Sequence, residues 1–274
     1  MIELGLQLNT VLPWFATGAV NGYTRVSVPA GESITWPAVI HHAVRRAYIS
    51  DEKLSDRAQA NGVPRAELLS AKLPNAGSVM SGDFAEILGY IYLAGANGGA
   101  IVGPKRWRLK HDRTKPAPGS DVVQMVLPHW PTASAEDRLV CAEVKAKATP
   151  GTWAPIDAAI TGMMNDRTSR LGRTLVWLRE RALFDDIGAI TISQLNRFIN
   201  ASEFPEYSRQ FHAIAVVCSD LVGQELTEFV PPTIPANCAL IVIDVPHLHE
   251  TYTAVYEAVR VSVPDPHTGG GAAL

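Results

Sequence analysis

The chain has 274 residues, of which 47% are hydrophobic and 19% charged, and its formal net charge at pH 7 is −3. This length and apolar content can form one sizeable core, which excludes a globally disordered chain. The slightly negative net charge excludes a uniformly basic nucleic-acid binder, although a local basic patch remains compatible with it.

The sequence also indicates the cellular compartment in which the protein is expected. No apolar stretch reaches the roughly 18–20 residues of a membrane span, and the sequence Met1-Ile2-Glu3-Leu4 lacks the basic start of a secretory signal. Cys141, Cys218 and Cys238 lie far apart without a Cys-x-x-Cys motif, which is typical of small buried thiols in a reducing compartment. We therefore expect a cytoplasmic protein that does not contact a membrane.

Residues 1–77 are predicted to form an N-terminal α+β extension. Residues 1–32 are strand-like, residues 36–46 fit an amphipathic helix, and a polar helix or loop continues to about Leu73. The Pro74-Asn75-Ala76-Gly77 turn marks a boundary. Two roles are open for this region: it binds a partner protein, or it extends the sheet and completes the core.

Residues 78–262 are predicted to form the principal domain, and residues 263–274 a flexible tail. The domain begins with an apolar helix, continues with three strands and several helices, and ends with two strands and a helix. The expected helices cover 84–94, 155–186 with a break near Gly172, 192–199 and 251–260, and the expected strands cover 106–111, 121–127, 139–147, 211–218 and 239–245. This order predicts an α/β fold with a mixed central sheet.

The strand expected at 139–147 carries an unusual set of side chains. Because side chains alternate along a strand, Glu143, Lys145 and Lys147 share one face, whereas Ala142, Val144 and Ala146 share the other. If the strand that begins at Asp121 pairs beside it, Asp121 and Glu143 converge next to Lys145. Two carboxylates can hold Mg²⁺ through hard oxygen ligands, and such a metal supports phosphodiester hydrolysis.

Asp121 followed by Glu143-x-Lys145 resembles the PD-(D/E)xK nuclease superfamily, which has the restriction-endonuclease-like fold. The superfamily opens its core with a helix that often carries an acid, and Glu86 stands in the corresponding helix here. The resemblance implies a catalytic set of Glu86, Asp121, Glu143 and Lys145. It implies Mg²⁺, for which Mn²⁺ can substitute, held by Asp121, Glu143 and Glu86. Ser120 stands where many members of the superfamily have proline.

The layout is also similar to the nuclease subunits of bacterial anti-phage systems, and in particular to the Hachiman-type subunit. Gly82 and Glu86 form a Gly-x-x-x-Glu pattern after a sizeable N-terminal region, and long helices follow the catalytic strand. This resemblance implies a DNA endonuclease controlled by a partner helicase. The alternatives are a non-catalytic DNA-docking or regulatory subunit with a nuclease-like fold, and an RNA nuclease.

Glu86 has a second interpretation. It is the only charged residue between Asp83 and Lys105, in a helix that is apolar on nearly every side, so its burial requires a partner such as a metal or a lysine. Alternatively, Asp83 is the N-cap of the helix and Glu86 completes a capping box three residues later.

The segment 105–115 is the most basic part of the chain. Its cations suit contacts to DNA phosphates, although a solvated edge strand explains them as well. The residues expected to bind DNA are Lys105, Arg106, Arg108, Lys110 and Lys147. Arg167, Arg170 and Arg173 lie around a helix junction, where they fit either DNA-backbone contacts or ordinary exposed arginines.

Overall fold

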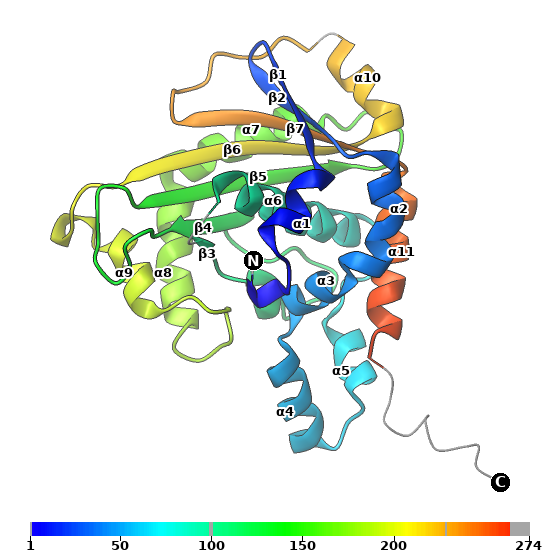
Figure 1. The fold of residues 1–274 in the computed structure, drawn as a ribbon, viewed down its shortest axis with the longest axis vertical. Helices are drawn as coiled ribbons and strands as arrows, with labels where there is room; N and C mark the ends of the chain where they lie inside the picture. The colour runs from blue at the N-terminus through cyan, green and yellow to red at the C-terminus, as the bar shows by residue number, and fades with distance from the viewer. Residues whose placement is uncertain (1, 99–100, 228, 264–274) are drawn as a thin grey trace.

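The computed structural model describes residues 2–98, 101–227 and 229–263 (Figure 1). Within these ranges seven strands form one mixed sheet in the order β1-β2-β7-β6-β5-β4-β3. β2, β7, β6 and β5 are parallel to one another, whereas β1, β4 and β3 join antiparallel to their neighbours. The strands are β1 Ala16–Val20, β2 Tyr23–Ser27, β3 Ile101–Val102, β4 Val122–Val126, β5 Arg138–Lys147, β6 Ser208–Cys218 and β7 Cys238–Val245. The predicted α/β class with a mixed central sheet is confirmed.

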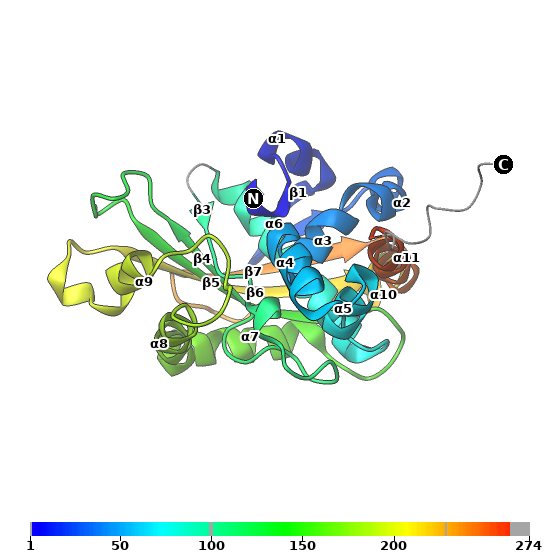
Figure 2. The ribbon, with the colours of Figure 1, turned by 90° about the horizontal axis from the view of Figure 1, so that it is seen from below.

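Helices cover both faces of the sheet, and each face has its own apolar core. One face packs against α2 (Ala30–Val39), α3 (His41–Tyr48), α6 (Ser78–Asn97) and α11 (Leu248–Val261). The other packs against α7 (Pro155–Asn165), α8 (Leu171–Arg181) and α9 (Ile192–Ile199). Figure 2 shows α7 and α8 on the side of the sheet opposite to α2 and α3. The remaining elements are η1 Ile2–Leu4, α1 Leu8–Val11, η2 Leu12–Trp14, α4 Asp51–Asn61, α5 Arg65–Lys72, η3 Arg106–Leu109, η4 Asp166–Arg170, η5 Ala201–Glu203 and α10 Ser219–Thr227.

The N-terminal region shares the sheet and the core with the rest of the chain. β2 pairs with β7 in parallel, and Trp36 of α2 packs in the same apolar core as Phe84 of α6 and Tyr256 of α11. The region therefore extends the sheet and completes the core, as the second of its two interpretations predicts. Of the predicted tail, residues 264–274 lie outside the described residues.

Several predicted elements need correction. The strand expected at 106–111 is wrong, because this segment forms the single-turn helix η3. The strand that precedes β4 is instead the two-residue β3. The helix expected at 36–46 is divided at Ile40 into α2 and α3. The break expected near Gly172 falls earlier, where Asp166–Arg170 forms a π-helical turn between α7 and α8.

The structure also bears on cysteines and membranes. Cys141 and Cys218 are buried, Cys238 is half-buried, and all three thiols are free. Among the described residues, no helix combines the length and the apolar character that crossing a membrane requires.

Candidate active site

The antiparallel pairing of β4 and β5 brings Asp121 beside Glu143. The ladder ends with Val122 opposite Ala142, so the register continues with Asp121 opposite Glu143, where neighbouring side chains approach within about 5 Å. Because β4 begins only at Val122, the N–H of Val144 lies beyond the paired residues and donates to Asp121 Oδ2, at 2.9 Å. The end of the strand pair thus fixes the Asp121 carboxylate next to Glu143.

Lys145 lies between these two carboxylates. It follows Glu143 by two residues on β5 and shares its face, as the strand period predicts. Its Nζ contacts Glu143 Oε1 and lies 3.6 Å from Asp121 Oδ2. Burial alone would lower the pKa of Lys145, but Asp121 and Glu143 outweigh it and raise that pKa. Lys145 is therefore a fixed positive charge and not a proton acceptor near neutral pH.

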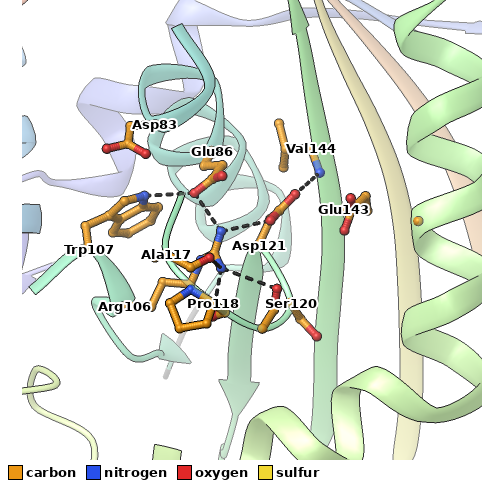
Figure 3. Close-up of polar contacts among 12 residues, drawn as sticks. Asp83, Glu86, Arg106, Trp107, Ala117, Pro118, Ser120, Asp121, Glu143 and Val144 are labelled. Carbon is orange, nitrogen blue, oxygen red and sulfur yellow. Dashed lines mark hydrogen bonds and ion pairs between the residues drawn. The ribbon is translucent and has the colours of Figure 1, made fainter. Parts of the chain in front are cut away.

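Glu86 reaches the site through Arg106. Glu86 Oε2 accepts from Arg106 Nη2 at 2.7 Å and from Trp107 Nε1 at 2.9 Å, and the same Nη2 donates to Asp121 Oδ1 at 2.8 Å. Figure 3 shows the guanidinium of Arg106 between Glu86 and Asp121. Burial raises the pKa of Glu86 to about 8, Arg106 opposes this, and Asp121 adds to it.

The capping-box interpretation of Glu86 is wrong. α6 begins at Ser78, five residues before Asp83, so Asp83 lies inside the helix. Its Oδ2 accepts from Lys110 Nζ at 2.6 Å and from the Tyr48 hydroxyl at 2.7 Å. Asp83 therefore forms a buried ion pair in place of a helix cap.

Arg170 neutralises Glu143 on the face of the sheet that α7 covers, which is opposite to the face that α6 covers. It belongs to the π-helical turn η4, and its Nη2 contacts Glu143 Oε2 while its Nε donates to Asp166 Oδ1 at 2.6 Å. Asp166 Oδ1 also accepts from Ser120 Oγ at 2.6 Å. A polar chain therefore connects the loop before β4 to Glu143. Ser120 and Asp166 were not predicted as site residues, since the sequence gives no sign that they meet.

When its three acids are all ionised, the charges of this cluster are balanced by side chains alone. The three carboxylates of Glu86, Asp121 and Glu143 face the three cations of Arg106, Lys145 and Arg170. Burial raises the pKa of Glu143, Asp121 adds to this, and Lys145 and Arg170 oppose it. Bringing a divalent cation into the cluster would therefore require at least one of these side-chain cations to move.

Asp121 and Glu143 have the donor chemistry that Mg²⁺ requires, because carboxylate oxygens are hard ligands. Their oxygens also converge on one point, since both lie near the ammonium group of Lys145. Among the described residues, Glu86 is hydrogen-bonded to Arg106 and Trp107, and its role as a metal ligand stays a prediction. Over residues 2–98, 101–227 and 229–263, no group of three or more His, Cys, Asp or Glu side chains is arranged to hold a metal ion.

Comparison with known families adds an independent observation. A family model named HamA matches residues 33–259, more than four-fifths of the chain. The chain belongs to the HamA family. This is the Hachiman anti-phage defence family, so the resemblance to the Hachiman-type subunit is confirmed and a part in anti-phage defence is indicated. No curated protein matches the chain.

The HamA match begins within α2 and ends within α11. It therefore includes all four predicted catalytic residues and leaves the hairpin of β1 and β2 outside. The site described above lies entirely in the part of the chain that the family shares.

The basic side chains that were predicted to face DNA are not exposed in the structure, so that prediction is wrong in this respect. Lys105, Arg106, Arg108 and Lys110 are each at most 7% exposed. Arg106 bridges two site carboxylates, and the other three pair with acids far away in the sequence. The pairs are Lys105 with Glu3, Arg108 with Glu3 and Asp186, and Lys110 with Asp83.

Lys147 is also buried, at 6% exposure. Its Nζ contacts Glu225 Oε1 at 2.6 Å and two main-chain carbonyls at 2.7 and 2.8 Å. These contacts use its charge inside the protein, so in this structure Lys147 is not available to a phosphate backbone.

Gly162 of α7 makes room for Glu143. A Cβ atom at this position would overlap the side chain of Glu143, whereas a Cβ at Gly172 of α8 would meet no atom within 4 Å. We expect Gly162→Ala to reduce the free energy of unfolding by about 1–3 kcal/mol through overpacking. Gly172→Ala, the matched control, should leave it unchanged or raise it by up to about 1 kcal/mol because of helix propensity. Urea unfolding measures both, and equal effects of the two substitutions would contradict the close packing around Glu143.

Proposed function

We propose that this chain is a metal-dependent DNA endonuclease that acts as the nuclease effector of its anti-phage system. The observation that carries the proposal is the placement of Asp121 opposite Glu143, with Lys145 between them, just before β4 begins and where β5 continues past the paired residues. Asp121 and Glu143 would hold Mg²⁺ or Mn²⁺, which would stabilise charge on the scissile phosphate and lower the pKa of the attacking water.

The other side chains have roles that follow from their contacts. Lys145, whose positive charge is fixed between the two carboxylates, would stabilise the negative charge that develops on the phosphate. Arg106 orients Asp121 and keeps Glu86 buried behind it. Arg170 holds Glu143 from the opposite side.

We further propose that a partner helicase gates this activity. A DNA nuclease without sequence specificity endangers the host chromosome, and each site carboxylate is paired with an arginine. A partner that moved Arg170 would release Glu143. Leu183 and Phe184, which are 60% and 86% exposed just after α8, offer apolar surface for such a partner.

A plasmid-nicking assay tests the nuclease proposal. We expect the purified protein, alone or with the products of neighbouring genes, to nick DNA in Mg²⁺ and not in EDTA. Lys145→Met should lower the nicking rate by about a hundredfold, because one electrostatic contact to the transition state is lost. Lys115→Met, at a lysine whose side chain is 75% exposed, is the control and should be as active as the wild type.

The same assay separates the remaining alternatives. One alternative is a non-catalytic DNA-docking subunit, which the pairing of every site carboxylate with an arginine favours. Such a subunit would bind DNA and would not cut it under any of these conditions. Cleavage of RNA in place of plasmid would assign the site to an RNA nuclease. Full activity of the isolated chain without a partner or nucleotide would contradict gating while supporting the nuclease.

A further inference from the structure

A cleft of about 580 Å³ opens beside the candidate active site. Its walls come from the start of α6, from β5, from the loop 148–153 and from the first turns of α11, and they include Glu86 and Lys145. This volume lies within the range of about 300–1,000 Å³ that is typical of ligand-binding clefts. A substrate that reached Lys145 would therefore also contact this cleft.

Aromatic side chains line the part of the cleft away from the carboxylates. Trp153 is 51% exposed although it is large and apolar. On α11, His249 packs edge to face on Tyr252, with ring centroids 5.3 Å apart. Tyr252 is itself only 4% exposed, whereas Trp153 and His249 are exposed, and exposed flat rings are surfaces on which nucleic-acid bases stack.

A buried lysine holds the Trp153 loop in place. Lys147 Nζ donates to the carbonyl oxygens of Gly151 at 2.7 Å and Trp153 at 2.8 Å, and Glu225 neutralises it. Because these contacts fix the main chain on both sides of Thr152, the indole is positioned by the β5 strand that carries the site. The exposure of Trp153 is thus a property of an anchored loop.

The charge of the cleft does not suit a duplex backbone. Among the described residues that line it, the lysines are Lys145 and Lys147, and both are paired with carboxylates. A protein that tracks double-stranded DNA uses several unpaired lysines or arginines along its groove. Recognition in this cleft must therefore depend more on base faces than on phosphate charge.

We propose that the cleft receives single-stranded DNA, with one base stacked on Trp153 and the exposed ring of His249, which packs on the buried Tyr252, providing a second aromatic surface. The inference rests on the proposed nuclease function, because it names the strand form that the site would cut. It makes Trp153 a determinant of substrate form, and it gives Lys147 a positioning role in place of the DNA contact predicted from the sequence.

Binding in EDTA tests the inference without requiring cleavage. The full-length protein is titrated into a fluorescent oligothymidine, and anisotropy gives the affinity. Loss of one stacked base predicts that Trp153→Ala binds about tenfold more weakly, whereas Trp153→Phe retains most of the affinity. Ile34→Ala removes an apolar side chain that is 77% exposed and lies outside the cleft lining, and it should bind as the wild type does. His249→Ala provides a second cleft variant, and thermal melts establish that each variant is folded.

Two further ligands identify the contact. An abasic oligonucleotide keeps the phosphates and lacks the bases, so wild type and Trp153→Ala should bind it equally. A blunt duplex should bind the wild type more weakly than the single strand does. Equal affinity of wild type and Trp153→Ala for oligothymidine, or a preference of the wild type for duplex, would overturn the inference.

Cleavage in Mg²⁺ is a separate measurement, so the two proposals can fail independently. Trp153-dependent binding without cleavage by any preparation would reject the nuclease and retain the single-strand cleft. Cleavage with Trp153-independent binding would do the reverse.

Discussion

Replacing Glu143 with Gln, or Asp121 with Asn, is expected to lower the rate of Mg²⁺-dependent DNA cleavage by at least about a hundredfold. Each substitution keeps the shape of the side chain and removes an anionic oxygen on which the proposed metal site depends. Both residues are buried and ion-paired, so each amide variant must be shown to be folded before its rate is interpreted. Nicking rates measured beside thermal melts check the expectation.

Glu136→Gln is a suitable control for this pair, because the Glu136 side chain is 73% exposed and lies in the loop between β4 and β5. It should cleave at the wild-type rate. Undiminished cleavage by well-folded Glu143→Gln and Asp121→Asn would remove both residues from the site, whatever other activity the chain retains.

The second large effect is expected on stability. Arg106→Met should reduce the free energy of unfolding by about 3–5 kcal/mol near neutral pH, because the buried Glu86 and Asp121 lose their shared cation. The same substitution would have only a small effect on folding if Arg106 were an exposed phosphate contact. Urea unfolding of the full-length protein distinguishes the two situations.

The loss of stability in Arg106→Met is expected to depend on pH in a definite direction. Burial raises the pKa of Glu86 to about 8 against the opposing charge of Arg106, and removing that charge should raise it further. An acid whose pKa is raised in the folded state binds its proton more tightly there. The free energy of unfolding therefore falls as the pH rises from the pKa of the unfolded state toward the pKa of the folded state. The deficit of Arg106→Met should therefore be smaller at about pH 5.5 than at about pH 8.5.

Arg173→Met is the matched control, since Arg173 is exposed on α8. It should change stability by less than about 0.5 kcal/mol at either pH. A deficit of Arg106→Met that is small, or that grows on acidification, would contradict the bridge between Glu86 and Asp121.

The strands that carry the site were predictable because their patterns are local. Period-two alternation placed Glu143 and Lys145 on one face of a strand, and β5 has that arrangement. The strand at 121–127 was predictable because four of the five residues of β4 are apolar; the structure buries all five, including the polar Gln124. The boundaries of α9 were predicted at the residues where the structure has them, Ile192 and Ile199.

The basic segment was misinterpreted because its partners lie far away in the sequence. Lysines and arginines are rarely buried unless they are paired, and the one nearby acid, Asp112, pairs with Lys115 instead. Glu3, near the N-terminus, and Asp186, in the loop after α8, supply the charge for Lys105 and Arg108. For the same reason the polar chain through Ser120, Asp166 and Arg170 could not be found from spacing alone.

The π-helical turn at Asp166–Arg170 has a consequence for how related sequences align. In this turn the N–H of Leu171 reaches back five residues to the carbonyl of Asp166, so the segment contains one residue more than an uninterrupted α-helix of the same length. A family member with a single deletion between Gly162 and Thr174 would regain regular α-helical bonding, and every later side chain would turn by about 100° around the axis. It could not keep an arginine on both Asp166 and Glu143, and we expect such a sequence to differ at those two positions as well.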